Sequence, residues 1–239
     1  MPVKYLKVLA LLLCLTILLC GCNGKNKPTE TEAPTTEASE TTLPTETLEI
    51  LTTEAPTEPP EILEILQYGA FSGAYVEDGS DEAVENIACI LVTNHSEGYI
   101  DYAVLHAQFG DTVGEFILTG IPAGGTAWVM ESKRLSLSGD EDYSYVDQTI
   151  SQIRTESMID HRAEVTFSKG AIEVKNVSTE TLPGVKVYYK QLHNDGNFLG
   201  GITYTLSTGE LPAGQSTTLL SAHSTEGSCA LVRLDCVEE

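Results

Sequence analysis

The sequence is short of positive charge. It has 13 Lys and Arg against 35 Asp and Glu, which gives a formal net charge of −22. A surface this acidic repels phosphate backbones and anionic headgroups, so nucleic-acid binding is excluded as a function class. The same charge can attract cations or a basic partner, and it keeps an extracellular domain soluble.

Catalytic and metal-binding motifs are also missing. The sequence has no G-x-S-x-G string, no H-E-x-x-H string and no C-x-x-C pair, and its five histidines are scattered. We therefore expect no catalysis, no cofactor and no metal site. A Cys/His pair that is brought together only by the fold cannot be seen in a sequence, so an enzyme remains the less favoured alternative.

One hydrophobic run occurs, near the start of the chain. Leu9–Leu19 follows Lys7 and leads into Leu-Cys-Gly-Cys, which ends at Cys22. The run is shorter than the roughly 20 residues of a membrane span. A basic start, an apolar middle and a small residue before the cleavage point predict a secretory signal at 1–21. An ordinary secretory signal with an incidental cysteine is the alternative reading.

The cysteine just past the cleavage point makes this segment resemble a bacterial lipoprotein signal, whose cysteine receives a diacylglyceryl group. The resemblance implies a lipid on Cys22, and two acyl chains anchor a protein stably. We therefore expect the chain to be held at the extracellular face of the cell membrane, with the membrane as one partner.

Three cysteines remain after signal removal and acylation: Cys89, Cys229 and Cys236. Seven residues of straight strand would place Cys229 and Cys236 roughly 23 Å apart. A disulfide needs Cα atoms within about 7 Å, so these two do not pair without a turn. A bond from Cys89 to one of them, or three buried free thiols, both remain open.

Residues 22–61 are rich in Thr, Glu and Pro, with recurring T-E-x-P units. Such a segment buries too little apolar surface to fold, and we predict a disordered acidic stalk that could reach on the order of 100 Å when extended. The string Leu-Glu-Ile-Leu ends at Leu51 and again at Leu66. The second copy is expected to begin the folded region, and the first has no assigned role.

The rest of the chain reads as β-strands. Apolar residues alternate in short runs that Asn, Ser, Gly and Pro interrupt, which is typical of strands and turns. One such run contains Tyr102, Val104 and His106 and predicts that His106 faces inward. Helical periodicity is weak throughout, so the predicted fold class is all-β.

The strand pattern occurs twice. The string V-x-N-x-S begins at Val92 and again at Val174, and Ile-Pro-Ala-Gly from Ile121 matches Leu-Pro-Ala-Gly from Leu211. Both N-x-S strings fit glycosylation sequons, but their matching positions favour a turn that Asn and Ser stabilise. The repeat predicts two tandem β-sandwich modules, at 62–158 and 159–239.

This motif order resembles the FxLYD-like and related immunoglobulin-like modules of Gram-positive lipoproteins. The second half, around Val187–Lys190 and Leu199–Tyr204, is also similar to two-module surface lipoproteins of anaerobic Firmicutes. No Phe-x-Leu-Tyr-Asp string occurs. The resemblance implies tandem immunoglobulin-like sandwiches at the cell surface and says little about chemistry.

Two loops are candidate recognition surfaces, because sandwich modules expose their end loops. One loop occurs in the second module alone and consists of Asn194, Asp195, Gly196 and Asn197. The other is acidic and consists of Asp140, Glu141 and Asp142. The acidic loop, and a second one at 78–82, could bind Ca²⁺, but neither follows the EF-hand spacing. We expect both to be solvated loops.

These features together predict a lipid-anchored extracellular binding or adhesion module of a bacterial cell surface. Its partner would be a protein or a glycan, since a long stalk is useful when something distant is contacted. The alternative is a structural or accessory lipoprotein of a membrane or cell-wall complex, for example in transport or secretion.

Overall fold

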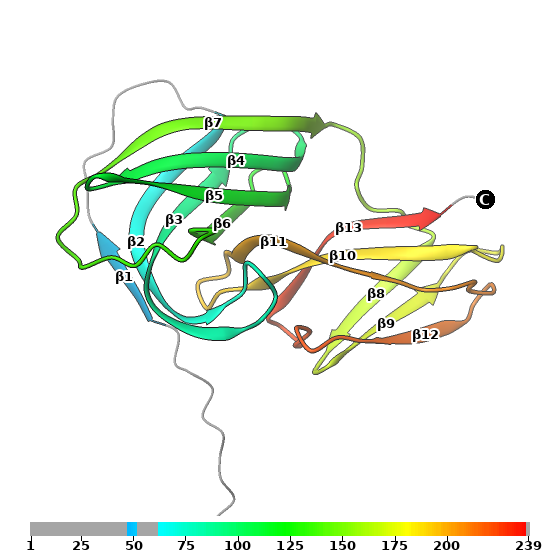
Figure 1. The fold of residues 1–239 in the computed structure, drawn as a ribbon. Coiled ribbons are helices and arrows are strands. Elements are labelled where there is room, and N and C mark those ends of the chain that lie inside the picture. Colours follow the sequence, from blue (N-terminus) through cyan, green and yellow to red (C-terminus); the bar gives the residue numbers. More distant parts are fainter. Residues whose placement is uncertain (1–46, 52–61, 238–239) are drawn as a thin grey trace, which may run out of the picture. The chain divides into compact units, whose positions relative to one another are not determined.

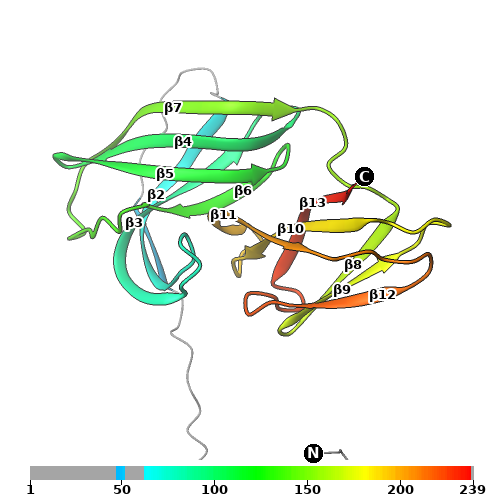
Figure 2. The ribbon, with the colours of Figure 1, turned by 45° about the vertical axis from the view of Figure 1, so that its right-hand side comes forward.

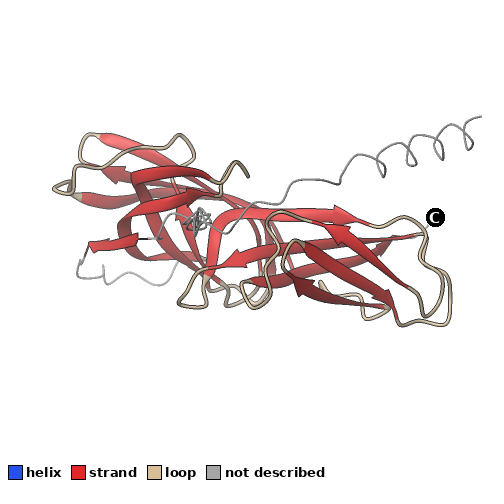
Figure 3. Cartoon of the chain, turned by 90° about the horizontal axis from the view of Figure 1, so that it is seen from below, coloured by secondary structure: helices blue, strands red, loops and turns tan. Residues whose placement is uncertain are grey.

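The computed structural model of the protein describes residues 47–51 and 62–237, which belong to one compact unit, Thr42–Glu239. Every regular element in these residues is a strand (Figure 1; Figure 3), so the all-β prediction is confirmed. The strands are β1 Thr47–Leu51, β2 Leu63–Tyr75, β3 Glu82–Asn94, β4 Tyr99–Phe109, β5 Thr112–Ile121, β6 Thr126–Met130, β7 Tyr143–Arg154, β8 Ala163–Ser168, β9 Ala171–Asn176, β10 Gly184–Leu192, β11 Phe198–Ser207, β12 Ser216–Leu220 and β13 Cys229–Val237.

The first half of the folded region contains two groups of paired strands. Strands β2, β3 and β6 pair in that order, and β5, β4 and β7 form a separate three-stranded sheet. Figure 2 shows the second group lying across the first. Their facing sides share a core that includes Ile90 and Val92 of β3, Leu105 of β4 and Phe116 of β5. Alternation of apolar and polar residues along β4 and β5 buries one side of each strand, as period-two patterning requires.

The second half repeats these pairings. Strands β8, β9 and β12 form one three-stranded sheet, and β11, β10 and β13 pair in that order. Its core includes Ile172 and Val174 of β9, Val187 and Tyr189 of β10, and Leu234 of β13. Strand by strand, β8–β13 take the places of β2–β7.

The two halves share one sheet. Strand β6 pairs in parallel with β11, with Ala127 opposite Phe198 and Trp128 opposite Leu199, so seven strands run in the order β1-β2-β3-β6-β11-β10-β13. Strand β5 also approaches β11 closely: a Cβ on Gly201 would collide with the carbonyl oxygen of Ile117. Only glycine allows this backbone contact between the halves.

The paired V-x-N-x-S and I/L-P-A-G strings form the same buried structure twice. Asn94 Nδ2 donates to the carbonyls of Gly98 (2.9 Å) and Ile121 (3.1 Å). Asn176 Nδ2 donates in the same way to Glu180 (2.7 Å) and Leu211 (2.8 Å). Each asparagine is fully buried, and its Oδ1 accepts from the serine two residues later.

This structure explains why the strings recur together. The asparagine amide joins the end of one strand to the I/L-P-A-G turn that follows another, and it satisfies backbone groups that would otherwise be buried without partners. The strings therefore have a structural role in each half, as the turn interpretation expects.

Two expectations differ from the structure. Residues 47–51 lie within the predicted disordered stalk, yet they form β1 on the edge of β2. Five residues with β-forming Leu and Ile can add to a sheet edge that already exists, although they could not fold alone. The other predicted stalk residues, and the signal at 1–21, lie outside the described residues.

The second difference concerns His106. The buried side of β4 carries Ala103, Leu105, Ala107 and Phe109, so His106 faces outward. Its Nδ1 lies 2.6 Å from Asp147 Oδ1 on the neighbouring β7. Both sides of β4 carry apolar residues, so alternation alone did not determine which side is buried.

Candidate functional site

A buried polar cluster lies where the two halves meet, and it centres on Gly201 of β11. Glu77 follows β2, and its carboxylate accepts from the backbone N–H groups of Met130 (2.8 Å) and Gly201 (2.9 Å). Lys190 of β10 is fully buried, and its Nζ donates to the carbonyls of Gly201 (2.8 Å) and Ile202 (2.7 Å). A carboxylate from one half and an ammonium group from the other thus bind the same glycine.

Burial perturbs both charges. It raises the pKa of Glu77 above its ordinary value, although the amides of Gly201 and Met130 and the charge of Lys190 oppose the rise. Burial lowers the pKa of Lys190 below its ordinary value, against the attraction of Glu77. Strongly shifted pKa values occur at functional sites and also in structural ion pairs. Here both groups use their hydrogen bonds on backbone atoms, which is the pattern of a structural clamp.

This cluster is not apparent from the order of the residues. Lys190 lies on the side of β10 that carries exposed Lys186 and half-buried Tyr188, so it reads as a solvent-facing residue. It is buried because the other half of the chain covers it. A basic residue directly after half-buried Tyr188 and buried Tyr189 is the one signal in the sequence, and it is weak.

The candidate loop Asn194–Asn197 reaches the other half. Asp195 Oδ2 accepts from Trp128 Nε1 of β6 at 2.9 Å, and Asp195 Oδ1 lies 3.0 Å from His193 Nδ1. Burial alone would raise the pKa of Asp195, but bonds from Trp128, Asn197 and His193 outweigh it and lower the pKa to about 2. Asn194, Asp195 and Gly196 are all exposed, so the loop is bonded to the other half through a side chain that stays accessible.

The acidic loop Asp140–Asp142 is held by its central residue. The Glu141 carboxylate accepts from Ser138 N and Oγ (both 2.6 Å) and from Gly139 N (2.9 Å). Hydrogen bonds from Ser138 lower the pKa of Glu141 to about 2. The carbonyl of Asp142 also accepts from Gly110 N in the β4–β5 turn at 2.7 Å. Asp140 and Asp142 are left exposed on an ordered backbone.

The other acidic loop is tied down by basic residues. Arg134 donates to Asp78 (2.8 Å) and Glu82 (2.6 Å), and Asp81 lies 2.9 Å from His223. Within residues 47–51 and 62–237, no three His, Cys, Asp or Glu side chains gather as a metal site would require.

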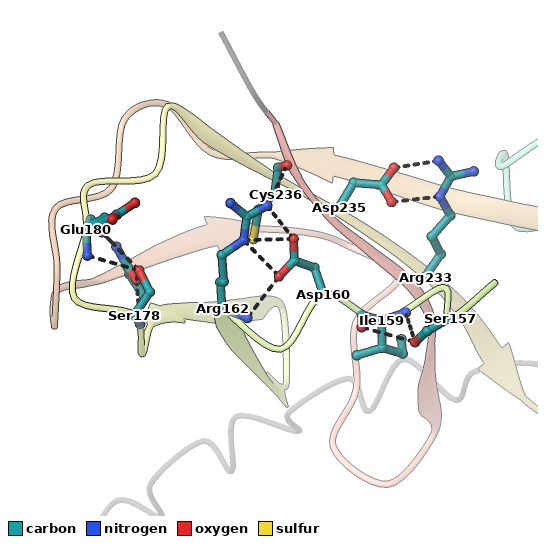
Figure 4. A network of polar contacts seen from close by, with 10 residues as sticks. Ser157, Ile159, Asp160, Arg162, Ser178, Glu180, Arg233, Asp235 and Cys236 are labelled. Carbon is teal, nitrogen blue, oxygen red and sulfur yellow. Dashed lines mark hydrogen bonds and ion pairs between the residues drawn. The ribbon is translucent and has the colours of Figure 1, made fainter.

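An open cleft of about 450 Å³ lies between residues 157–162 and the end of β13. Figure 4 shows Asp160 and Arg162 facing each other beside Cys236; Arg162 Nη2 lies 2.7 Å from Asp160 Oδ2. Hydrogen bonding to Arg162 holds the pKa of Asp160 below its usual range. Asp160 and Arg162 therefore neutralise each other, and the third charged residue of the lining, Asp235, pairs with Arg233 at 2.7 Å.

All three cysteines in the described residues are free and buried, which resolves the disulfide question in favour of thiols. Burial raises the pKa of Cys89 to about 12 and that of Cys236 to about 11. A thiol that stays protonated at neutral pH is a poor nucleophile. Their environments are those of structural cysteines.

Cys22 lies outside the described residues, as does the rest of the signal. In the part of the chain that is described, no helix is both long and apolar enough to cross a bilayer. The geometry thus leaves the predicted lipid anchor as an expectation.

Comparison with known proteins gives no further guide to function. No protein-family model, no curated protein and no solved structure matches the chain.

Proposed function

We propose that this chain is a lipid-anchored extracellular binding or adhesion protein of a bacterial cell surface. In this proposal Cys22 carries the lipid, residues 22–46 and 52–61 form the acidic stalk, and the folded region consists of two immunoglobulin-like sandwiches. The repeated pairing of β2–β7 and β8–β13 supports the sandwich assignment. A resemblance of short motifs to Gram-positive lipoprotein modules supports the location.

The observation that carries the binding proposal is the ordered acidic loop. Three donors fix Glu141, and the backbone of Asp142 is bonded to the β4–β5 turn. Asp140, Asp142 and the nearby turn residue Asp111 are exposed. A loop that is already ordered loses less entropy on binding, and three exposed carboxylates favour a basic surface on the partner.

The other polar clusters are bonded internally, which supports a binding function without catalysis. Glu77, Lys190, Asp160 and Arg162 satisfy one another or backbone atoms. The outward-facing His106 pairs with Asp147 rather than with a serine or cysteine. A serine or cysteine nucleophile is activated by a hydrogen bond to a neighbouring base such as histidine.

The proposal is tested by removing two of the three exposed carboxylates, those of the acidic loop itself. Asp140→Asn with Asp142→Asn should weaken binding of the purified ectodomain to whole cells or to a partner recovered from them, and should leave its melting temperature within about 1–2 °C. Glu164→Gln with Glu173→Gln, an exposed acidic pair on β8 and β9, is the matched control for net charge.

Equal loss of binding in the control would show that net charge, rather than this loop, attracts the partner. Turnover of peptides, esters or glycans that a single substitution such as His106→Ala abolishes would contradict the proposal of binding without catalysis.

A further inference from the structure

Strand β1 occupies the outer edge of β2. Thr47 lies opposite Ser72, and the pairing continues through Leu51 opposite Tyr68. In the second half β8 takes the place of β2, and among the described strands it pairs with β9 alone. Of these two equivalent edges, the edge of β2 is the one that pairs with an additional strand. That strand is β1, which lies close in sequence to the predicted anchor at Cys22.

Backbone hydrogen bonds of β3 determine which groups of β2 face β1. Ala88 of β3 donates to Leu135 O at 2.7 Å and accepts from Glu131 N at 2.8 Å, so it turns its backbone groups away from β2. In an antiparallel pair, the partner of such a residue also turns its groups outward. Ala70, which lies opposite Ala88, therefore directs its N–H and C=O toward Glu49 of β1.

This alternation separates neighbouring residues. Glu49 exchanges two backbone hydrogen bonds with Ala70, whereas Ile50 directs its N–H away from β2. On β2, the Ala70 amide is paired by β1, whereas the amides of Gly69 and Phe71 face β3.

We propose that Thr47–Leu51 is an exchangeable strand and that the edge of β2 accepts the same segment from a second copy of the chain. The contacts are backbone pairs, so an identical segment from a neighbour makes identical bonds, which is the basis of strand swapping. The pairing itself brings few like charges together, because β1 carries a single acid, Glu49, and β2 carries Glu64 alone.

Chain length permits both arrangements. The return path from Leu51 beside Tyr68 to Leu63 covers five residues of β2, roughly 17 Å. Residues 52–61 can span roughly 33 Å, so the connection does not confine the segment to its own β2.

Concentration decides between the two arrangements. A short connection gives the chain's own segment an effective concentration on the order of millimolar, so a dilute chain pairs with itself. Exchange of β1 between two chains needs a high density of chains, as on a crowded membrane. This step rests on the proposed lipid anchor.

Hydrogen exchange tests the acceptor edge in the mature chain with Cys22→Ser. Glu49→Pro removes the N–H that donates to the Ala70 carbonyl, and so weakens the pairing that also protects the Ala70 N–H. Ile50→Pro is the matched control, because the Ile50 N–H faces away from β2. Exchange of the Ala70 amide should rise about tenfold in Glu49→Pro and stay near the wild-type rate in Ile50→Pro. Exchange of the Gly69 amide, which faces β3, should have the same rate in the wild type and in both proline variants. Unchanged Ala70 exchange in Glu49→Pro would overturn the assignment of the edge.

Cysteine cross-linking tests whether the β1 segment on the edge of β2 comes from the same chain or from a second copy. Thr47→Cys with Ser72→Cys places two thiols at opposite positions, and an N-terminal histidine tag holds the chain on nickel-chelating vesicles without acylation. Non-reducing electrophoresis should show a disulfide within one chain in dilute solution and a disulfide between chains at high density on vesicles. Adding Glu49→Pro should abolish both.

Cross-links that stay within one chain at every density would overturn the exchange. Cross-links between chains that persist with Glu49→Pro would show random collision instead. Since the tag replaces the lipid, failure of the predicted anchor leaves these results unaffected.

Discussion

Replacing Lys190 with methionine tests the clamp between the halves. Methionine has a similar length and fills the buried space of the lysine stem, but it donates no hydrogen bond. The carbonyls of Gly201 and Ile202 then lose their donor, and Glu77 loses its nearby cation. An unpaired buried polar group costs about 1–3 kcal/mol, and here two buried carbonyls lose their donor at once.

We therefore expect Lys190→Met to lower the free energy of unfolding by about 3–5 kcal/mol. In a folded region of this size the melting temperature should fall by roughly 10 °C. Urea denaturation of the purified ectodomain, followed by tryptophan fluorescence, measures the free energy directly, because Trp128 lies beside the same junction. Lys186→Met is the matched control: it is exposed on the same strand and should change stability by less than about 0.5 kcal/mol.

The double variant Glu77→Gln with Lys190→Met completes the cycle. Glutamine keeps an acceptor for the Gly201 and Met130 amides but carries no charge, so the double variant should lose less stability than the two single variants added together, with a coupling of about 0.5–3 kcal/mol. Additive losses, or a loss below about 1 kcal/mol for Lys190→Met, would refute the reasoning that the two charges stabilise each other across Gly201.

Two further predictions follow from the junction and from the repeated turn. Asn94→Ala and Asn176→Ala should each cost about 2–4 kcal/mol in urea denaturation, because each removes bonds to two buried strand ends; exposed Val177→Ala should cost far less, and an equal cost would contradict the assigned role. The lowered pKa of Asp195 gives a stability contribution that is present above about pH 4 and is lost as the pH falls through about 2. Asp195→Asn keeps an acceptor for Trp128 but does not titrate, so its stability should fall less between pH 4 and 2 in thermal unfolding, and identical acid profiles would count against the prediction.

Local features of the sequence determined the all-β class and the two asparagine turns. Alternation of apolar residues and the placement of Asn, Ser, Gly and Pro act over a few neighbouring residues, so they can be read without the fold. The matching strings at Val92 and Val174, and at Ile121 and Leu211, correctly marked positions that form the same hydrogen bonds in each half. Anchoring at Cys22 is likewise a sequence-based prediction, and it lies outside the described residues.

Tertiary structure alone decided the junction and the sheet edge. Lys190 and Glu77 lie 113 positions apart, and nothing local shows that the second half buries a lysine under the first. The buried side of β4, and with it the outward position of His106, depended on which of two similar faces met the opposing sheet. Strand β1 has the composition to pair but needs the edge of β2 before it can form. In each case the free energy comes from a surface contributed by a distant part of the chain, which is why a reading of neighbouring residues could not supply it.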